Sequence, residues 1–295
     1  MRHGVCWLIL ARFQLQPMVA CAILLLLHGP AKAAAVNTEF EVFGVHDNNP
    51  SRARAEDNVG AENIQGARLT FLRSMLLDER SGIVFQGGGV VERHSTFSGL
   101  NNIALNARLR YRIQPTVGYT LPWYEMFIDL ERRQYADSAI RDGTSAAIEL
   151  SAGKQFTDRI YSTAGFGLKR SVADHDYLFD LTQRKLFITL GYRFGAQNIL
   201  YASLSKTRGD QVFGASESHG VSGAVKASAD DPVFGEGYYA YRMDTASTIA
   251  EAGVNLPVRG RGSLDISAKR YRAYAYGGPA YEYTLAQIGW RYSFY

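Results

Sequence analysis

Arginine occupies every second position in one stretch of the chain, NIALNARLRYRIQ, where Arg108, Arg110 and Arg112 alternate with apolar residues. The next stretch, WYEMFIDLERR, carries acidic residues at the same spacing. Alternate side chains of a β-strand point to opposite faces, so a cationic strand face would lie beside an anionic one. We expect Arg108 to face Asp129 and Arg112 to face Glu125, and each such pair would stabilise the neighbouring strands by about 0.2–1 kcal/mol.

Ionisable residues continue on the same expected strand face along the rest of the chain. If the strands close into a membrane barrel, this face must line its lumen, because charges are costly against lipid but tolerated in a water-filled interior. The expected lumen-lining residues are Arg68, Arg108, Arg110, Arg112, Glu125, Asp129, Glu131, Arg133, Lys169, Arg193, Lys269 and Arg291. An open lumen with arginine on its wall would favour anions, because arginine binds carboxylate or phosphate in a bidentate manner. A lumen filled by its own ion pairs is the alternative, and both interpretations stay open.

A serine–histidine hydrolytic site is the other chemistry to weigh. It needs a hydroxyl within hydrogen-bond reach of an imidazole that a third group orients. The candidates are His94 with Ser95, His175 between Asp174 and Asp176, and His219 among Ser216, Ser218 and Ser222. Spacing alone does not establish such a site. We expect the protein not to be an enzyme, and assign no catalytic residue, metal or cofactor.

The elements that must position these residues are strands, because apolar and polar residues alternate with period two through most of the chain. Each segment is close to the ten residues that a tilted membrane strand needs. Twelve strands are expected, at 38–46, 65–76, 82–93, 102–114, 122–134, 143–154, 159–170, 184–195, 198–208, 245–257, 262–272 and 281–294. Short turns such as QFTD and GAQN alternate with long connections, which predicts an even strand number with both termini on the short-turn side.

A cleavable leader is expected before these strands. Basic residues precede the apolar run MVACAILLLL, and small residues follow it, which is typical of a secretory signal peptide. Cleavage after Ala33 or Ala35 fits equally well, so residues 1–35 are expected to be the signal peptide and 36–295 a single barrel domain. The run is too short to cross about 30 Å of hydrocarbon as a helix.

Composition after removal of the leader narrows the class further. Both cysteines, Cys6 and Cys21, lie in the leader, so the exported chain would hold no disulfide. Arg2, Arg12 and Lys32 leave with it, and 29 basic residues remain against 28 acidic ones. Nucleic acid is therefore not an expected partner. A membrane protein without long apolar segments must cross as a closed β-barrel.

The leader, the alternating strands and the aromatic C-terminus WRYSFY resemble those of bacterial outer-membrane β-barrel proteins of the porin-like class. The resemblance covers essentially the whole mature chain. It implies a transmembrane antiparallel up-and-down β-barrel of about twelve strands in the outer membrane of a Gram-negative bacterium. It also implies that barrel-assembly machinery reads Trp290, Tyr292 and Phe294, with Tyr295 as one extra residue. Trp123 and Tyr124 are expected in an aromatic girdle at the membrane surface.

The expected function is passive, porin-like transport of small polar or anionic solutes. The alternatives are a surface-loop binding or assembly barrel with a filled lumen, and an outer-membrane lipid hydrolase. Expected partners are outer-membrane lipid and lipopolysaccharide, the assembly machinery and small polar solutes. The acidic segments ADHDYLFD and ADDPVFGEG could hold divalent cations that bridge lipopolysaccharide. A soluble β-sandwich shows the same alternation, but its apolar faces pack together and it needs no aromatic girdle.

Overall fold

Strands of one antiparallel sheet make up nearly all of the structure. The structure is a computed structural model. It describes residues 36–54, 60–116, 118–195, 197–216, 225–258, 260–275 and 280–294. The expected signal peptide and Tyr295 lie outside the described residues. The wall strands are β1 (Val36–Asp47), β2 (Glu62–Leu76), β3 (Ser81–His94), β4 (Asn102–Ile113), β5 (Trp123–Tyr135), β6 (Gly143–Gln155), β7 (Ile160–Ala173), β8 (Leu181–Phe194), β9 (Asn198–Ser216), β11 (Tyr238–Val258), β12 (Gly262–Ala275) and β13 (Ala280–Phe294). All twelve strands expected from the sequence are confirmed.

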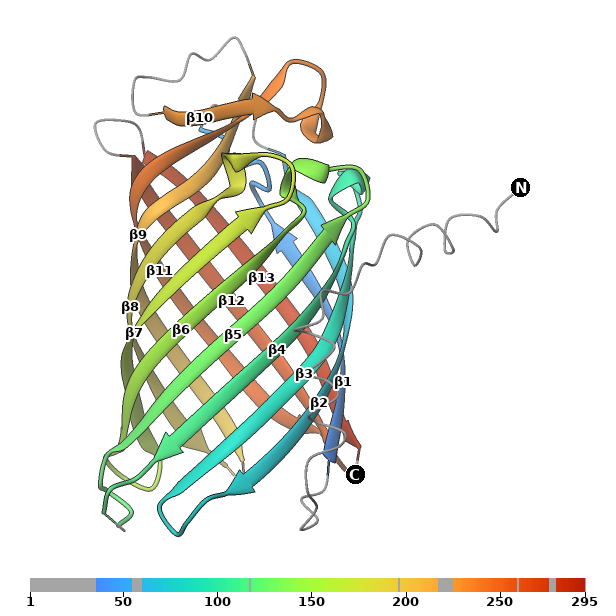
Figure 1. Ribbon diagram of the computed structural model, residues 1–295. Coiled ribbons are helices and arrows are strands. Elements are labelled where there is room, and N and C mark those ends of the chain that lie inside the picture. The colour runs from blue at the N-terminus through green and yellow to red at the C-terminus, as the bar shows by residue number, and fades with distance from the viewer. Residues whose placement is uncertain are drawn as a thin grey trace.

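The sheet closes on itself as a barrel (Figure 1). Consecutive strands pair around the ring, β9 pairs with β11, and β13 returns to β1. The closing pair runs from Thr38 opposite Phe294 to Asp47 opposite Leu285. Closure leaves the wall without a free edge, as a membrane-spanning sheet requires. The expected up-and-down barrel with an even number of strands is confirmed.

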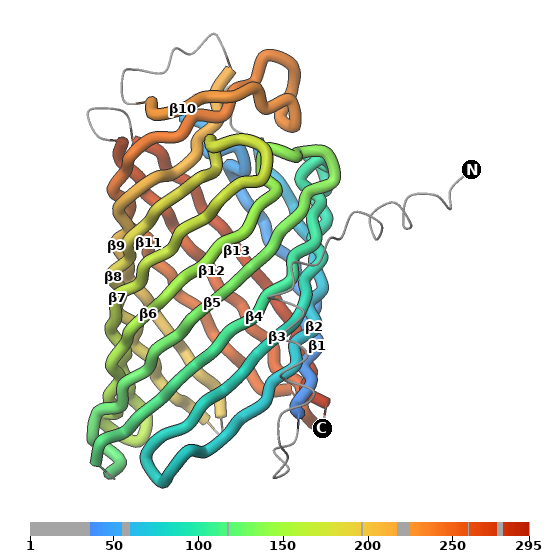
Figure 2. Tube along the Cα trace, viewed as in Figure 1, coloured from blue at the N-terminus to red at the C-terminus, as the bar shows by residue number. Residues whose placement is uncertain are grey.

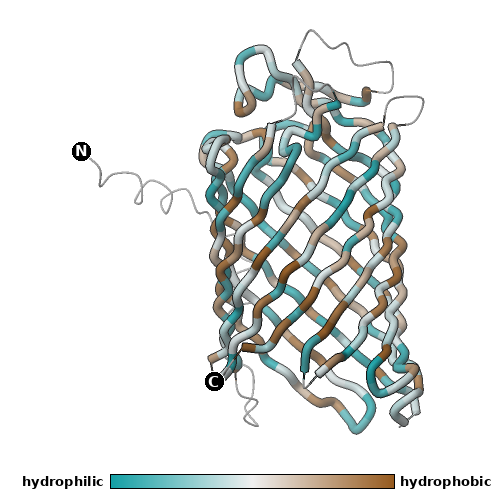
Figure 3. Tube along the Cα trace, turned by 180° about the vertical axis from the view of Figure 1, so that it is seen from behind, coloured by the Kyte–Doolittle hydropathy of each residue, from teal (hydrophilic) through white to brown (hydrophobic). Residues whose placement is uncertain are grey.

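Apolar side chains cover the outside of the wall. Residues paired directly across neighbouring strands share a face, and Ile128, Ile148 and Leu168 are joined in this way. Hydrophilic and hydrophobic residues alternate along the strands (Figure 3). The large apolar residues that this face exposes include Val42, Leu69, Phe71, Val91, Ile128, Ile148, Leu150, Phe166, Leu168, Leu186, Ile188, Leu190, Leu200, Leu204, Ile266, Ile288 and Trp290. An exposed apolar surface of this extent suits lipid rather than water.

The two ends of the barrel differ. Both termini of the wall and the short turns lie at one end, called the turn end here; the longer connections lie at the other, the loop end (Figure 1). Short 3-10 helices shape four loop-end connections, namely η2 (Ser98–Leu100), η3 (Ala139–Arg141), η4 (Tyr177–Phe179) and η6 (Pro232–Phe234). In the described part of the chain, no helix is long and apolar enough to cross a membrane.

One connection departs from the sequence-based expectation. The strands expected at 198–208 and 245–257 leave residues 209–244 as a long connection, whereas β9 and β11 extend into this range and keep pairing up to Ser216 opposite Tyr238. A further strand, β10 (Val225–Asp230), pairs with the early part of β11. We call residues 225–237, which contain β10 and η6, the lid. The lid lies across the loop end of the barrel (Figure 2).

Candidate functional site: the barrel lumen

The inner face of the barrel carries the charged residues of β4 and β5. The register places Arg108 opposite Asp129 and Arg112 opposite Glu125, so the expected cross-strand pairing is confirmed. Arg108 forms an ion pair with Asp129, and an Arg112 nitrogen lies 3.8 Å from a Glu125 oxygen. The two arginines also lie over aromatic rings of β5, at 5.6 Å from the Phe127 centroid and 4.7 Å from that of Trp123. This part of the wall is an alternating layer of cations, acids and rings.

Further ion pairs continue around the same face. Arg68 lies 2.7 Å from Glu41, and Arg133 lies 2.8 Å from Glu92 and 3.2 Å from Glu131. Arg133 thus faces two acids with one positive charge, while Arg68 and Glu41 balance each other, and most of the inner wall is close to neutral. Two more pairs complete the set of expected residues with acidic partners, Lys269 with Glu251 at 3.2 Å and Arg291 with Glu39 and Glu41 at about 4 Å.

Three of the expected lumen residues have no acidic partner among the described residues. Arg110 lies opposite Phe127, with its guanidinium 5.0 Å from the ring centroid. Arg193 donates to the Gln155 amide oxygen at 3.5 Å and lies 5.2 Å from the Tyr161 ring centroid. Lys169 forms no described ion pair. Arg110, which lies between two paired arginines on its strand, therefore carries the net positive charge of that stretch of wall.

Sequence reasoning missed two members of this face. Lys185 forms a 3.4 Å ion pair with Glu149, and Glu41 is shared between Arg68 and Arg291. The period-two alternation of the sequence could have identified both residues. The alternation that selects Arg193 on β8 also selects Lys185, eight residues earlier, and β1 alternates in the same way around Glu41.

Aromatic rings on the inner face lie over glycines of the neighbouring strand. A Cβ atom added to the glycine would come within 2.1–2.7 Å of the ring in each case, so only glycine fits there. The pairs are Phe43 over Gly66, Trp123 over Gly153, Tyr161 over Gly191, Phe187 over Gly165 and Tyr201 over Gly253. Such ring–glycine contacts cover exposed backbone in designed and natural sheets. Here they also keep five large rings flat against the wall and out of the lumen.

Trp123 corrects one expectation about the aromatic girdle. Tyr124 is 47% exposed on the outer face, but Trp123 alternates to the inner face, where it covers Gly153 and contacts Arg112. Adjacent residues of a strand cannot share a face, so only one of the two could join the girdle. Trp290 and Phe294 are exposed on the outer face of β13, and Tyr292 lies between them with ring centroids 6.0 and 4.9 Å away. Recognition of these three residues by the barrel-assembly machinery stays a prediction.

The connection after β1 folds across the loop end from β1 to β9. Arg52 forms a 2.7 Å ion pair with Asp47 and lies 3.8 Å above the Tyr283 ring. The Ser51 carbonyl accepts a hydrogen bond from Gly214 of β9 at 2.8 Å. Burial acts to lower the pKa of Arg52, but the hydrogen bond to Asp47 and the electrostatic effect of Tyr283 outweigh it and raise that pKa. Arg52 thus stays protonated, and Asp47 balances its charge.

The lid is fastened to three other loop-end connections. Arg141 of η3 donates two hydrogen bonds to Asp231, at 2.7 and 2.5 Å, and both side chains are largely buried. The Phe234 ring packs edge-on against Phe97 at 4.9 Å. Leu178 of η4 is fully buried in a cluster with residues of β10 and β11. Beneath these contacts a cavity of about 290 Å³ is lined by Arg133, Lys169 and other residues of β5, β6 and β7.

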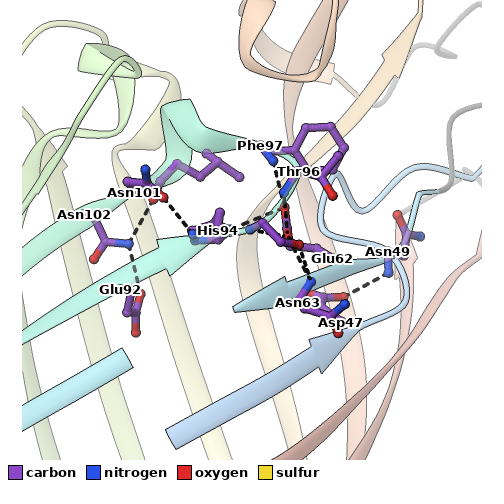
Figure 4. Close-up of polar contacts among 12 residues, drawn as sticks. Asp47, Asn49, Glu62, Asn63, Glu92, His94, Thr96, Phe97, Asn101 and Asn102 are labelled. Atoms are coloured by element: carbon purple, nitrogen blue, oxygen red, sulfur yellow. Dashed lines mark hydrogen bonds and ion pairs between the residues drawn. The ribbon is translucent and has the colours of Figure 1, made fainter. Parts of the chain in front are cut away.

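The connection after β3 is anchored on Glu62, as Figure 4 shows. The fully buried Glu62 carboxylate accepts hydrogen bonds from the Ser95 hydroxyl at 2.6 Å and from the backbone of Ser95, Thr96 and Phe97 at 2.8–3.1 Å. The His94 Nδ1 lies 3.8 Å from the same carboxylate. The Ser95 hydroxyl therefore donates to the carboxylate and not to the imidazole. In nucleophilic catalysis the hydroxyl bonds the imidazole, and the acid orients the imidazole. These contacts hold the loop in place.

The other histidine and acidic candidates lie in loop-end connections. Asp174 forms an ion pair with Arg132, and this hydrogen bond holds the pKa of Asp174 below its usual value. Asp176 accepts from the Leu178 amide at 2.8 Å. The three acids of ADHDYLFD and Asp231 of ADDPVFGEG are thus engaged by the chain itself, and in the described residues no group of acids is arranged to hold a metal ion. Neighbouring His175 shows no serine contact there, and His219, Ser218 and Ser222 lie outside the described residues.

Comparison with known proteins supports the fold. Neither a protein-family model nor a curated protein matches the sequence. Among solved structures, the chain is similar to an outer-membrane channel from Pseudomonas putida F1, with 12% identity and a TM-score of 0.57 over 90% of this chain and 99% of that channel. It is also similar to the β domain of the Bordetella autotransporter BrkA, with 13% identity and a TM-score of 0.44 over 88% of this chain and 100% of that domain.

The likeness to the Pseudomonas channel at this identity shows the fold, and the features of the wall agree with it. The wall is closed, its outer face is apolar, and its charges lie inside. The chain is therefore a closed twelve-stranded antiparallel β-barrel with an apolar outer face and a charged inner face, and it shares this fold with the Pseudomonas channel.

Proposed function

We propose that this barrel is a porin-like channel that lets small polar solutes cross the outer membrane passively and that favours anions. One observation carries the proposal: several arginine side chains of the inner wall remain in contact with solvent. The side chains of Arg108, Arg112 and Arg291 are 42%, 49% and 48% exposed although they lie inside a closed barrel. A lumen filled by its own ion pairs would bury them.

The preference for anions rests on the charges that the wall does not neutralise. Arg110, Lys169 and Arg193 have no acidic partner among the described residues, and they outnumber Asp265, an inward acid that Tyr201 and Asn255 bond instead of a cation. Low-dielectric walls focus the field of such charges into the space between them and raise the local concentration of counter-ions. Small anionic solutes, such as acidic sugars, are the substrate class that this field would enrich.

Single-channel recording in a planar bilayer tests the proposal. The purified barrel should conduct in KCl, and its reversal potential under a salt gradient should show anion preference. Replacing Arg108, Arg110 and Arg112 together with glutamine keeps their polarity and approximate size but removes three positive charges, and should shift the channel toward cations. Absence of conductance in wild type would overturn the proposal.

A barrel with a closed loop end is the second candidate, and the lid is the observation that favours it. Ion pairs and buried apolar contacts fasten the lid to its neighbours, so solutes would need a gap beside the lid or a movement of it. In that case the loop end would serve as a binding or assembly surface, and wild type would stay silent in the bilayer. We assign no catalytic role to His94 and Ser95, because the Ser95 hydroxyl is held by Glu62.

A further inference from the structure

The outer faces of β7, β8 and β9 change character at the same level. On β8 the outward side chains are apolar from the turn end up to Leu186, and Arg184 follows. On β7, Arg170 follows Phe166 and Leu168 in the same way, and on β9 Lys206 and Arg208 follow Leu204. We call Arg170, Arg184, Lys206 and Arg208 the basic patch. The three strands lie side by side in the wall (Figure 1).

The basic patch is exposed and is not neutralised by the chain. Arg184 and Arg208 are direct cross-strand partners, a placement in which like charges destabilise a sheet. Within the described residues none of the four side chains forms an ion pair. The acid nearest in sequence, Asp210, accepts from Lys226 at 2.7 Å and from the Thr182 amide at 3.2 Å. The four positive charges of the patch therefore remain available to an external anion.

An apolar groove adjoins the patch on the outer wall. It has a volume of about 680 Å³, and Lys206 contributes to its lining together with Phe166, Leu186, Ile188 and Leu204. These four apolar side chains point away from the lumen. The groove continues from the cationic level into the apolar band, so one amphipathic molecule could contact both.

We propose that the basic patch and this groove bind lipopolysaccharide of the outer leaflet, with its lipid A phosphates on the patch and an acyl chain in the groove. The loop end faces the outer leaflet, because the termini and short turns mark the periplasmic side of such barrels. Charges on the lipid face are costly at the middle of the bilayer and cheap near its surface, which agrees with the position of the patch above the apolar run. Arginine is suited to phosphate because its planar guanidinium binds two oxygens at once.

Other cations at the same level of the wall differ in one respect. Arg132 forms an ion pair with Asp174. Arg270 and Arg272 lie 2.9 and 2.8 Å from Glu282. Arg132 has an acidic partner of its own and Arg270 and Arg272 share one, whereas the four residues of the basic patch have none among the described residues. The paired arginines provide the matched control for an experiment.

Binding of lipid A in detergent micelles tests the proposal. The folded barrel, verified by its gel mobility before and after heating, is titrated with bisphosphorylated lipid A and with the same lipid after removal of both phosphates. Wild type should bind the phosphorylated form at least tenfold more tightly. The variant R170Q/R184Q/K206Q/R208Q should lose at least tenfold, because each basic side chain near an anionic lipid surface contributes roughly a factor of five. The control R270Q/E282Q removes one positive and one negative charge at the same level of the wall and should stay within about twofold of wild type.

Three results would overturn the proposal: equal binding by wild type and the fourfold variant, an equal loss in the control, or full displacement of lipid A by millimolar inorganic phosphate. The last result would indicate an anion site without lipid preference. If the fourfold variant does not fold, R184Q/R208Q removes only the two directly opposed charges and should still weaken binding severalfold. Single-channel conductance should not change in any of these variants, since the patch lies outside the lumen.

Discussion

Arg110 differs from the arginines two residues before and after it, because only Arg108 and Arg112 have an acidic partner. Removing Arg110 changes the net charge of the lumen by one unit, whereas removing Arg108 together with Asp129 leaves it unchanged. We therefore expect R110Q to shift the reversal potential toward cations and R108Q/D129N to leave it close to wild type. The shift should be clear near 0.1 M salt, where the screening length is about 10 Å, and small at 1 M, where it is about 3 Å.

Equal shifts in R110Q and R108Q/D129N would show that pairing across the strands does not decide selectivity. The net charge of Arg110 would then not be the source of the field. Reversal potentials under a KCl gradient, measured at both salt concentrations, distinguish the two outcomes.

Gly153 keeps the Trp123 ring flat against the wall. A Cβ atom at this position would lie 2.2 Å from the ring, so G153A should force Trp123 into the lumen. Conductance should fall and the fluorescence of Trp123 should change, while the loss of the cross-strand contact should cost no more than about 1 kcal/mol of stability. Gly167 gives a matched control, since a Cβ there meets its neighbours at 3.6 Å or more. Unchanged conductance in G153A would contradict this role of the ring.

The faces of these side chains could be predicted from the sequence, but their partners only in part. Period two assigns Arg108 and Asp129 to the inner wall, and the short connection between their strands sets the pairing. The ion pair of Arg133 with Glu92 depends on strands that are not consecutive. The inward position of Trp123 was missed because aromatic residues at a strand end suit both a girdle and a lumen, and the partner that decides, Gly153, lies thirty residues later.

At the scale of elements, the ion pair between Arg141 and Asp231 holds the lid to the connection between β5 and β6. Both side chains are largely buried, and breaking such a pair by removing one partner typically costs about 3–5 kcal/mol, because a charge is left without a partner. D231N should therefore loosen residues 225–237, raise their sensitivity to protease and increase the open time of the channel. R141Q/D231N should recover part of this loss, since no lone buried charge remains.

The exposed pair of Lys226 with Asp210 is the control for this prediction. Lys226 is 45% exposed, and pairs of this kind contribute at most about 1 kcal/mol, so K226Q should leave the protease sensitivity of the lid nearly unchanged. Limited proteolysis followed by mass spectrometry measures both variants. A lid that is equally resistant in D231N and wild type would show that its apolar contacts suffice.

The wall strands could be predicted well and the lid could not, for one physical reason. A strand between lipid and lumen must alternate apolar and polar residues, and this alternation identifies the strand in the sequence. Above the membrane both faces of β9 and β11 meet protein or water, so apolar and polar residues need not alternate. β9 therefore continues to Ser216, and β11 begins at Tyr238, without an alternating pattern in the sequence. β10 has only six residues, and its pairing with β11 follows from the closure of the ring rather than from its own sequence.

At the scale of the whole molecule, the wall and the lid rest on different interactions. The ladder of the wall is continuous, because β9 pairs with β11 directly from Ile199 opposite Asn255 to Ser216 opposite Tyr238. β10 adds to the outside of that ladder and is not part of the ring. Closure by β13 and β1 is likewise independent of the lid.

Replacing residues 217–237 with a two-residue Asn-Gly turn should therefore remove the lid and leave the barrel folded. The flanking strands are antiparallel and already in register, and Asn-Gly is the turn that joins such strands most readily. We expect the variant to keep its heat-dependent shift in gel mobility and to conduct more than wild type, because the Phe234, Asp231 and Leu178 contacts that close the loop end are lost. A variant that folds but conducts no better would place the constriction at Arg52 and the connection after β1. A variant that fails to fold would show that the lid helps the ring to close, which the continuous β9–β11 ladder argues against.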